Sequence, residues 1–222
     1  MYRSLEPYNT NDDWCIRIQS TYNNIIIRGN ARLSDSNLHT LPHFKYVSGD
    51  FDCSFNQLTS LEGCPTYIGG YLWCNKNHLT SLECCATYIG GRLDCGNNQL
   101  TSLKGCATYI GGGLYCYNNQ LTSLKYCATS IGGNLDCSHN QLTSLKGCAT
   151  SIGGVFDCSY NQLTSLKGCP VRINGDLYCR YNQLTNLEGC ATSIGGYLDC
   201  NHSNLKLSRP KGIKIRGEFI NE

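Results

Sequence analysis

Residues 70–90 read GYLWCNKNHLTSLECCATYIG, and close copies of this 21-residue unit follow one another along most of the chain. Its fifth position is a cysteine that recurs without a slip at Cys53, Cys74, Cys95, Cys116, Cys137, Cys158, Cys179 and Cys200. A second cysteine series keeps the same interval from Cys64 to Cys190. A fixed period in this range is typical of identical supersecondary units that stack and share one continuous core. The chain is therefore a repeat array, and its function is expected in the residues that differ between units.

Apolar and polar residues both hold fixed positions in the unit. The alternation Leu72-x-Cys74 predicts a short strand with one face inward, and Ile89 stands for a recurring Ile or Val that completes the core. The Gly-Gly pair before each strand predicts a turn with unusual backbone angles. An asparagine follows each strand at the same offset, from Asn56 to Asn182. Its side chain can bond both its own turn and the next coil, which satisfies backbone groups that would otherwise be buried unpaired.

These residues resemble a leucine-rich repeat. The pattern L-x-x-L-x-L-x-x-N-x-L is matched by Leu72-x-Cys74-x-x-Asn77-x-Leu79, with glycine at the first leucine position and Ile or Val one residue earlier. Segments 98–103 and 161–166, both NQLTSL, are similar to the short repeats of secreted bacterial effectors. The Cys and Gly-Gly variant resembles repeat proteins encoded by bacteriophages and large DNA viruses. The resemblance covers about residues 30–205.

The resemblance implies a β-rich solenoid. We expect a curved array with one parallel β-sheet, one short strand per 21-residue repeat, and extended or 3₁₀ turns on the convex side, because no repeat carries a long amphipathic segment. A solenoid grows by addition, so the 222 residues need no division into several cores. We predict an N-terminal cap over 1–30, the repeat solenoid over 31–205, and a C-terminal cap or tail over 206–222.

The ends of the array depart from the period. Counting 15 residues outward from the first and last strands predicts shortened strands at 16–18 and 213–215. Region 33–47 reads as a degraded repeat with one residue missing. Charged residues make up 15% of the chain, the net charge is +2, and no window approaches the ~18 apolar residues of a membrane span. No secretory signal is visible at the N-terminus, so we predict a cytoplasmic protein, in the host cytoplasm if the origin is viral.

The seventeen cysteines have three interpretations. Neighbouring coils could bring equivalent Cα atoms within disulfide range. We favour reduced, buried thiols, because the strand cysteines stand where the repeat family places leucine and free cysteine behaves as a small apolar residue. Zinc needs four converging ligands, whereas a ladder presents thiols in a line, and the adjacent pair Cys84 and Cys85 lacks C-x-x-C spacing. We expect no metal and no cofactor.

Catalysis finds little support in the sequence. The histidines are scattered, and no nucleophile, base and orienting residue recur together. The Gly-Gly pairs recur in nearly every repeat, so turn chemistry explains them better than a phosphate-binding loop. We therefore predict that the protein is not an enzyme.

The outward side of the predicted sheet carries the variation. Acidic and aromatic residues share its positions, and Tyr, Trp and Arg dominate binding hot spots. The candidate partner-binding residues are Tyr71, Trp73, Asp94, Tyr115, Tyr117, Asp136, Asp157, Tyr178, Tyr181 and Tyr197. Aromatic columns can also stabilise a sheet by cross-strand packing alone. Like charges in neighbouring strands oppose each other, so the acidic residues favour a protein partner with a basic or mixed surface.

A row of lysines at another position supports the alternatives. Lys104, Lys125, Lys146 and Lys167 could track phosphates, although no aromatic residues interleave with them and the small net charge gives little long-range attraction. A structural or self-assembling module is a further alternative. For the main hypothesis, a non-enzymatic protein-binding scaffold, we expect a monomer or weak homo-oligomer without membrane contact.

Overall fold

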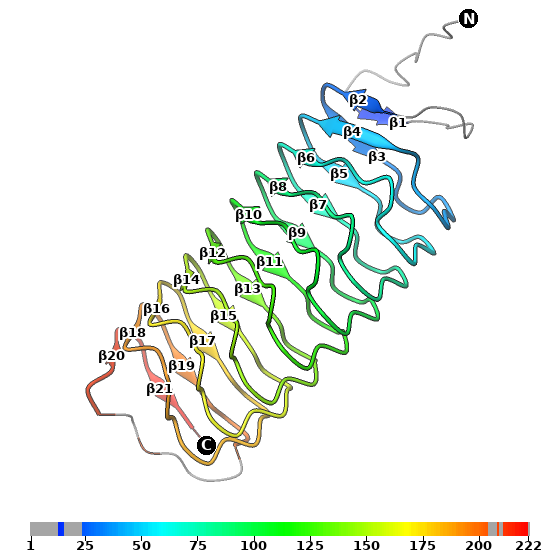
Figure 1. Cartoon of the computed structure of the whole chain (residues 1–222). Helices are drawn as coiled ribbons and strands as arrows, with labels where there is room; N and C mark the ends of the chain where they lie inside the picture. The colour runs from blue at the N-terminus through cyan, green and yellow to red at the C-terminus, as the bar shows by residue number, and fades with distance from the viewer. Residues whose placement is uncertain (1–12, 16–23, 204–207, 209–210, 222) are drawn as a thin grey trace, which may run out of the picture.

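The computed structural model describes residues 13–15, 24–203, 208 and 211–221, which form one stack of coils. Figure 1 shows an elongated solenoid with β1 and β2 at one end and β20 and β21 at the other. The described residues contain no α-helix and no 3₁₀-helix. The repeat protein with a β-rich, 21-residue solenoid that the sequence predicts is therefore confirmed, and extended turns rather than 3₁₀ turns connect its strands.

Sheet A is parallel, and its eleven strands follow one another in the order of the coils. Its strands are β1 (Asp13–Cys15), β3 (Asn30–Arg32), β5 (Phe51–Asp52), β7 (Leu72–Trp73), β9 (Leu93–Asp94), β11 (Leu114–Tyr115), β13 (Leu135–Asp136), β15 (Phe156–Asp157), β17 (Leu177–Tyr178), β19 (Leu198–Asp199) and β21 (Phe219–Ile220). From β5 onward each residue pairs with the residue 21 positions later, as Leu72 does with Leu93. This is the sheet that the alternation Leu72-x-Cys74 predicted.

Sheet B, which the sequence analysis did not predict, is a second parallel sheet of ten strands. Its strands are β2 (Ile25–Ile27), β4 (Phe44–Val47), β6 (Tyr67–Ile68), β8 (Tyr88–Ile89), β10 (Tyr109–Ile110), β12 (Ser130–Ile131), β14 (Ser151–Ile152), β16 (Arg172–Ile173), β18 (Ser193–Ile194) and β20 (Lys214–Ile215). Each coil thus contributes two short strands instead of the one expected. Most strands of sheet B are two residues long, and so short a strand shows no alternation in the sequence.

The Gly-Gly pairs connect the two sheets, and their role differs from the one predicted. Neither glycine of a pair has the left-handed φ that would require glycine. A Cβ added at Gly90 would lie only 2.1 Å from the carbonyl oxygen of Gly69 in the preceding coil. Close approach of neighbouring backbones therefore favours the pairs, although Ser48 and Asn174 take the first glycine's position in two coils. The prediction of unusual backbone angles was wrong in that no pair has a left-handed φ.

The core runs the length of the stack. The recurring Leu, Ile and strand Cys side chains are buried, and Leu121 and Cys116 are among those with no exposed surface. The asparagine that follows each strand is hydrogen-bonded as predicted. Asn119 donates from Nδ2 to the carbonyl oxygens of Cys95, Cys116 and Tyr117 and accepts at Oδ1 from the backbone N–H of Leu100. Each asparagine thereby joins two successive coils.

The ends of the array keep the period better than expected. Strand β20 lies where a strand was predicted at 213–215, but it pairs with β18 in sheet B instead of extending sheet A. Strand β21 pairs with β19 at the usual 21-residue separation. In the degraded repeat, Ile27 pairs with Val47 and Ala31 with Phe51, which confirms that one residue is missing. The strand predicted at 16–18 lies outside the described residues.

Candidate functional site

The outward side of sheet A carries two groups of aromatic and arginine side chains. The first, the aromatic cluster, comprises Tyr71, Trp73, Arg92, Tyr115 and Tyr117. The Tyr71 and Trp73 rings meet edge to face with centroids 5.3 Å apart. The guanidinium of Arg92 lies 4.9 Å from the Tyr115 ring centroid and 6.0 Å from that of Tyr71. Three successive coils thus contribute to one patch in which a cation links two rings.

Neighbouring residues hold this aromatic cluster in place. Arg92 is also ion-paired with Asp94 at 3.7 Å, and Asn134 donates to the Tyr115 hydroxyl at 3.2 Å. The Tyr117 ring packs on the backbone of Gly96, where an added Cβ would come within 2.5 Å of the ring. Burial, with the charges of Asp94 and Asp136, raises the pKa of Tyr117. The rings are therefore rigidly supported, while Tyr71 keeps 45% of its surface exposed.

The second group, the C-terminal cluster, repeats this arrangement with different partners. It comprises Asp176, Tyr178, Arg180, Tyr197 and Asp199. Tyr178 donates its hydroxyl to Asp176 at 2.8 Å, and that bond raises the pKa of Tyr178. The Arg180 guanidinium lies 4.9 Å from the Tyr178 ring centroid and is ion-paired with Asp199 at 3.6 Å. The structure therefore places Tyr71, Trp73, Tyr115 and Tyr117 in one cluster and Tyr178 and Tyr197 in another on the same face.

The acidic residues of this face also have a local structural role. Each accepts a hydrogen bond at Oδ1 from the backbone N–H two residues later, at 2.9 to 3.2 Å; these residues are Asp52, Asp94, Asp136, Asp157 and Asp199. Such a bond stabilises the turn that ends the strand. Turn stability thus explains the recurrence of aspartate at this position without a basic partner. Burial raises the pKa of Asp94 and of Asp136.

Tyr181 lies apart from these clusters, in the turn that follows sheet A. It belongs to a column of stacked rings formed by His139, Tyr160, Tyr181 and His202, with centroids 4.1, 4.3 and 4.1 Å apart. All four have a left-handed backbone, with φ between 51° and 58°. That conformation is unfavourable for a bulky residue, and ring stacking between coils offsets its cost.

Sequence reasoning missed a second column of rings, on sheet B. Tyr46, Tyr67, Tyr88 and Tyr109 stack with centroids 4.9, 4.7 and 4.8 Å apart. Their recurrence at 21-residue intervals, next to the core isoleucine, was the signal in the sequence. Without the second sheet, there was no reason to place them on one face.

The lysine row is exposed and partly engaged. Lys104 is ion-paired with Glu83 at 2.7 Å, and Lys167 with Glu188 at 3.0 Å. The Lys125 ammonium lies 4.8 Å from the Tyr126 ring centroid. Two of the four ammonium groups therefore already have a carboxylate from the adjacent coil as counter-charge.

The cysteines from Cys53 to Cys200 are free thiols, and those of the strand series are fully buried. Burial raises the pKa of the Cys116 thiol well above its usual range, and that of Cys127 to about 11. Cys84 is exposed and has a left-handed backbone. Among the described residues, no group of three or more His, Cys, Asp or Glu side chains is placed to hold a metal ion.

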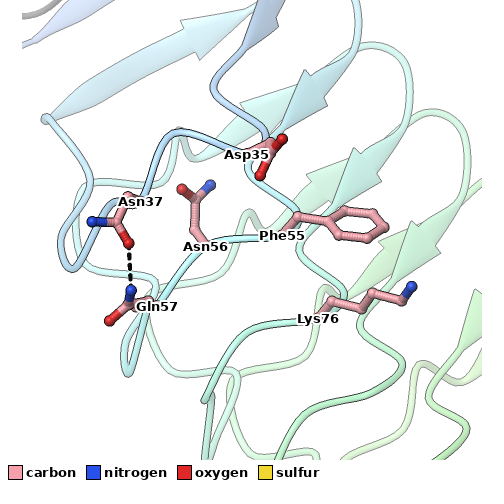
Figure 2. A pocket seen from close by; sticks show the side chains of 6 residues that line it. All are labelled: Asp35, Asn37, Phe55, Asn56, Gln57 and Lys76. Carbon is pink, nitrogen blue, oxygen red and sulfur yellow. Dashed lines mark hydrogen bonds between the residues drawn. The ribbon is translucent and has the colours of Figure 1, made fainter.

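A shallow pocket of about 370 Å³ lies near the N-terminal end (Figure 2). Asp35, Asn37, Phe55, Asn56, Gln57 and Lys76 line it. The Lys76 ammonium lies 4.3 Å from the Phe55 ring centroid, and Gln57 donates to Asn37. Figure 2 shows the Phe55 and Lys76 side chains extending in the same direction, away from that amide pair. The lining contains no nucleophile paired with a base.

Comparison with known proteins adds no assignment: neither a family model nor a curated protein matches the chain. Within the described part of the chain, no helix is long and apolar enough to cross a bilayer.

Proposed function

We propose that the protein is a non-enzymatic scaffold that binds a protein partner through the outward face of sheet A. The observation that carries this proposal is the aromatic cluster, where Tyr71, Trp73 and Tyr115 stand partly exposed around Arg92 on a rigid sheet. Rings that are already held in place lose little conformational entropy when a partner covers them. A cluster of this composition is typical of binding hot spots.

Two features favour this face over the lysine row. A nucleic acid would have to compete with Glu83 and Glu188 for two of the four lysines. The row also presents a single ring, Tyr126, beside Lys125, whereas single-stranded binding surfaces supply successive rings for base stacking. If the resemblance to viral and effector repeats reflects the origin of the chain, the partner belongs to a host cell and the encounter takes place in its cytoplasm.

The test is capture from a cell lysate on immobilised protein, followed by mass spectrometry and affinity measurement with the protein retained. Paired substitution of Trp73→Ala with Tyr115→Ala should weaken binding by at least about 2 kcal/mol. The fold should remain nearly intact, because both side chains point away from the core.

The control is paired charge reversal, Lys125→Glu with Lys146→Glu, on a different side of the coil. These variants should bind with little change, because exposed charges outside an interface act only through screened fields. Binding that survives the aromatic changes and is abolished by the lysine changes would move the site to the lysine row and refute the proposal.

A further inference from the structure

Two acidic residues on the outward face lie side by side without an ion-pair partner among the described residues. Asp94 is ion-paired with Arg92, and Asp199 with Arg180. Asp136 and Asp157 lie directly beside each other in the parallel register of β13 and β15. No lysine, arginine or histidine of the described residues forms an ion pair with either carboxylate.

These two acids lie between the two clusters, on coils whose outward strand positions carry no aromatic ring. Their coils carry only small or medium side chains there, and we call this region the acid trough; it comprises Asn134, Asp136, Ser138, Val155, Asp157 and Ser159. The ring of Tyr115 stands one coil before it, and the ring of Tyr178 one coil after it. Three coil steps of about 4.8 Å separate Tyr115 from Tyr178, so the two flanking positions are roughly 14 Å apart.

The hydrogen bonds of the trough leave acceptors and a donor unused. Asp136 accepts from the backbone N–H and the hydroxyl of Ser138, both at Oδ1. Asp157 accepts only from the backbone N–H of Ser159, also at Oδ1. Both Oδ2 atoms thus receive no hydrogen bond from the described residues. The Ser159 hydroxyl, in a residue only 2% exposed, has no partner among them either, although Ser138 at the same position is engaged.

Electrostatics in the trough favour a cation. Burial raises the pKa of Asp136, and the charge of Asp157 raises it further. Two adjacent carboxylates with partial burial repel each other, and a positive group between them would remove that repulsion. The same chain shows which group suits this surface: Arg92 and Arg180 each lie over a tyrosine ring and beside an aspartate.

We propose that the acid trough docks an arginine-bearing segment of the protein partner, with its guanidinium bonded to the carboxylates of Asp136 and Asp157. This rests on the proposed function, because the trough adjoins the aromatic cluster on the same face. A guanidinium has five donors in one plane and can reach both free Oδ2 atoms, whereas an ammonium is a point charge that does not match two carboxylates in this way. Stacking on Tyr115 or Tyr178 would add to the recognition.

The experiment measures binding of a short fluorescein-labelled peptide, in which arginine alternates with serine, by fluorescence anisotropy on the full chain. Paired substitution of Asp136→Asn with Asp157→Asn removes both charges but keeps the Oδ1 acceptors that stabilise the turns. Affinity should fall at least about tenfold. The matched control, Glu83→Gln with Glu188→Gln, removes the same charge from acids that are ion-paired with lysines outside this face. It should change affinity by no more than about twofold.

Peptide controls test the chemistry. The peptide with citrulline in place of arginine should not bind, and the lysine peptide should bind at least about tenfold more weakly. Equal losses in the aspartate pair and in the glutamate pair, or equal binding of the lysine peptide, would show that only general charge attraction acts and would overturn the proposal. Thermal melting of each variant checks that the fold is kept.

The outcome can be separated from that of the proposed function. Lysate capture that depends on Trp73 and Tyr115 but survives the Asp136→Asn and Asp157→Asn pair would overturn the trough and leave the scaffold function standing. If the arginine peptide binds specifically but lysate capture is unchanged by the Trp73→Ala and Tyr115→Ala pair, the aromatic site is overturned instead. Loss of self-association, measured by sedimentation, in the Asp136→Asn and Asp157→Asn pair with no effect on the peptide would identify a second copy of this chain as the occupant and also overturn the proposal.

Discussion

The interior of the solenoid and the outward face of sheet A follow opposite rules, although they belong to the same strands. Inside, successive coils present the same side chains, such as Cys95 and Cys116, or Asn98 and Asn119. Outside, Trp73, Asp94 and Tyr115 follow one another at a single position. An interior residue must fit identical neighbours above and below, while an outward residue meets solvent on one side. The interior positions that repeat in every coil therefore account for most of the stability. Partner recognition is expected at the outward positions of sheet A, which differ from coil to coil.

The largest expected effect is a loss of stability at high pH, when the buried thiols of the interior ionise. Strand thiols from Cys53 to Cys179 are fully buried, and burial raises their pKa above the usual value of 9.0, with the hydrogen bond to Cys200 as the larger cause at Cys179. Their stabilising effect is complete below pH 9 and is lost as the pH rises toward the folded-state values. Each thiol lowers the free energy of unfolding by about 1.4 kcal/mol per pH unit above pH 9. The strand thiols at 21-residue intervals from Cys53 to Cys179, which we call the thiol column, together lower it by roughly 10 kcal/mol per pH unit, comparable to the whole stability of a domain.

Denaturant midpoints followed by circular dichroism from pH 7 to 11 would show this as a steep loss of stability above pH 9. Cys116→Val is the matched control, and it should reduce the slope by about 1.4 kcal/mol per pH unit. A stability that stays level up to pH 11 would contradict the burial of the thiol column.

A single core side chain comes next in size. Leu121→Ala should lower the free energy of unfolding by about 2–5 kcal/mol, because Leu121 has no exposed surface and the coils on either side hold the cavity open. Chemical denaturation measures the change. The exposed neighbour Thr122→Ala should stay within about 0.5 kcal/mol, and a comparable small change at Leu121 would contradict its inward placement.

The asparagine column should respond less strongly. Asn119→Ala leaves three carbonyl oxygens without the Nδ2 donor and the Leu100 N–H without its acceptor. We expect a loss of about 1–3 kcal/mol in the free energy of unfolding. Gln120→Ala, at the exposed next residue, is the control and should be nearly neutral. A neutral result at Asn119 as well would mean that water replaces these bonds.

The smallest expected effect concerns two tyrosines with a strained left-handed backbone, of which one gains ring stacking and the other does not. Tyr126 and Tyr160 both have left-handed backbones, with φ of 72° and 54°. Tyr160 stacks on two neighbours, whereas Tyr126 stands where every other full coil but that of Cys84 has glycine. Tyr126→Gly should stabilise the protein by about 0.5–1 kcal/mol, and Tyr160→Gly should destabilise it by about 1 kcal/mol. Melting temperatures of the two variants, compared side by side, test the difference, and a shift of the same sign in both would refute it.

Much of the fold could be predicted from the period. Identical residues at 21-residue intervals required stacked coils, and the alternation around Leu72 located sheet A. Sheet B was missed because its two-residue strands leave no alternation of apolar and polar residues in the sequence. The Gly-Gly pairs were misinterpreted because a close approach of two backbones and an unusual dihedral angle both favour glycine, so the sequence does not distinguish them. The candidate site was predicted as a set of residues, but its division into two clusters and a trough was not.

The sequence by itself determined the interior, because each interior position meets copies of itself and the repeat specifies its neighbours directly. The tertiary structure decided the face. Whether an aspartate there holds its own turn, pairs with an arginine or stands free depends on which side chains the register brings alongside it. Asp199 and Asp136 occupy the same position in the repeat, yet of the two only Asp199 is ion-paired with an arginine of the preceding coil, Arg180. The physical reason is that contacts across coils combine residues about 20 positions apart, so one repeat does not reveal what its neighbour supplies.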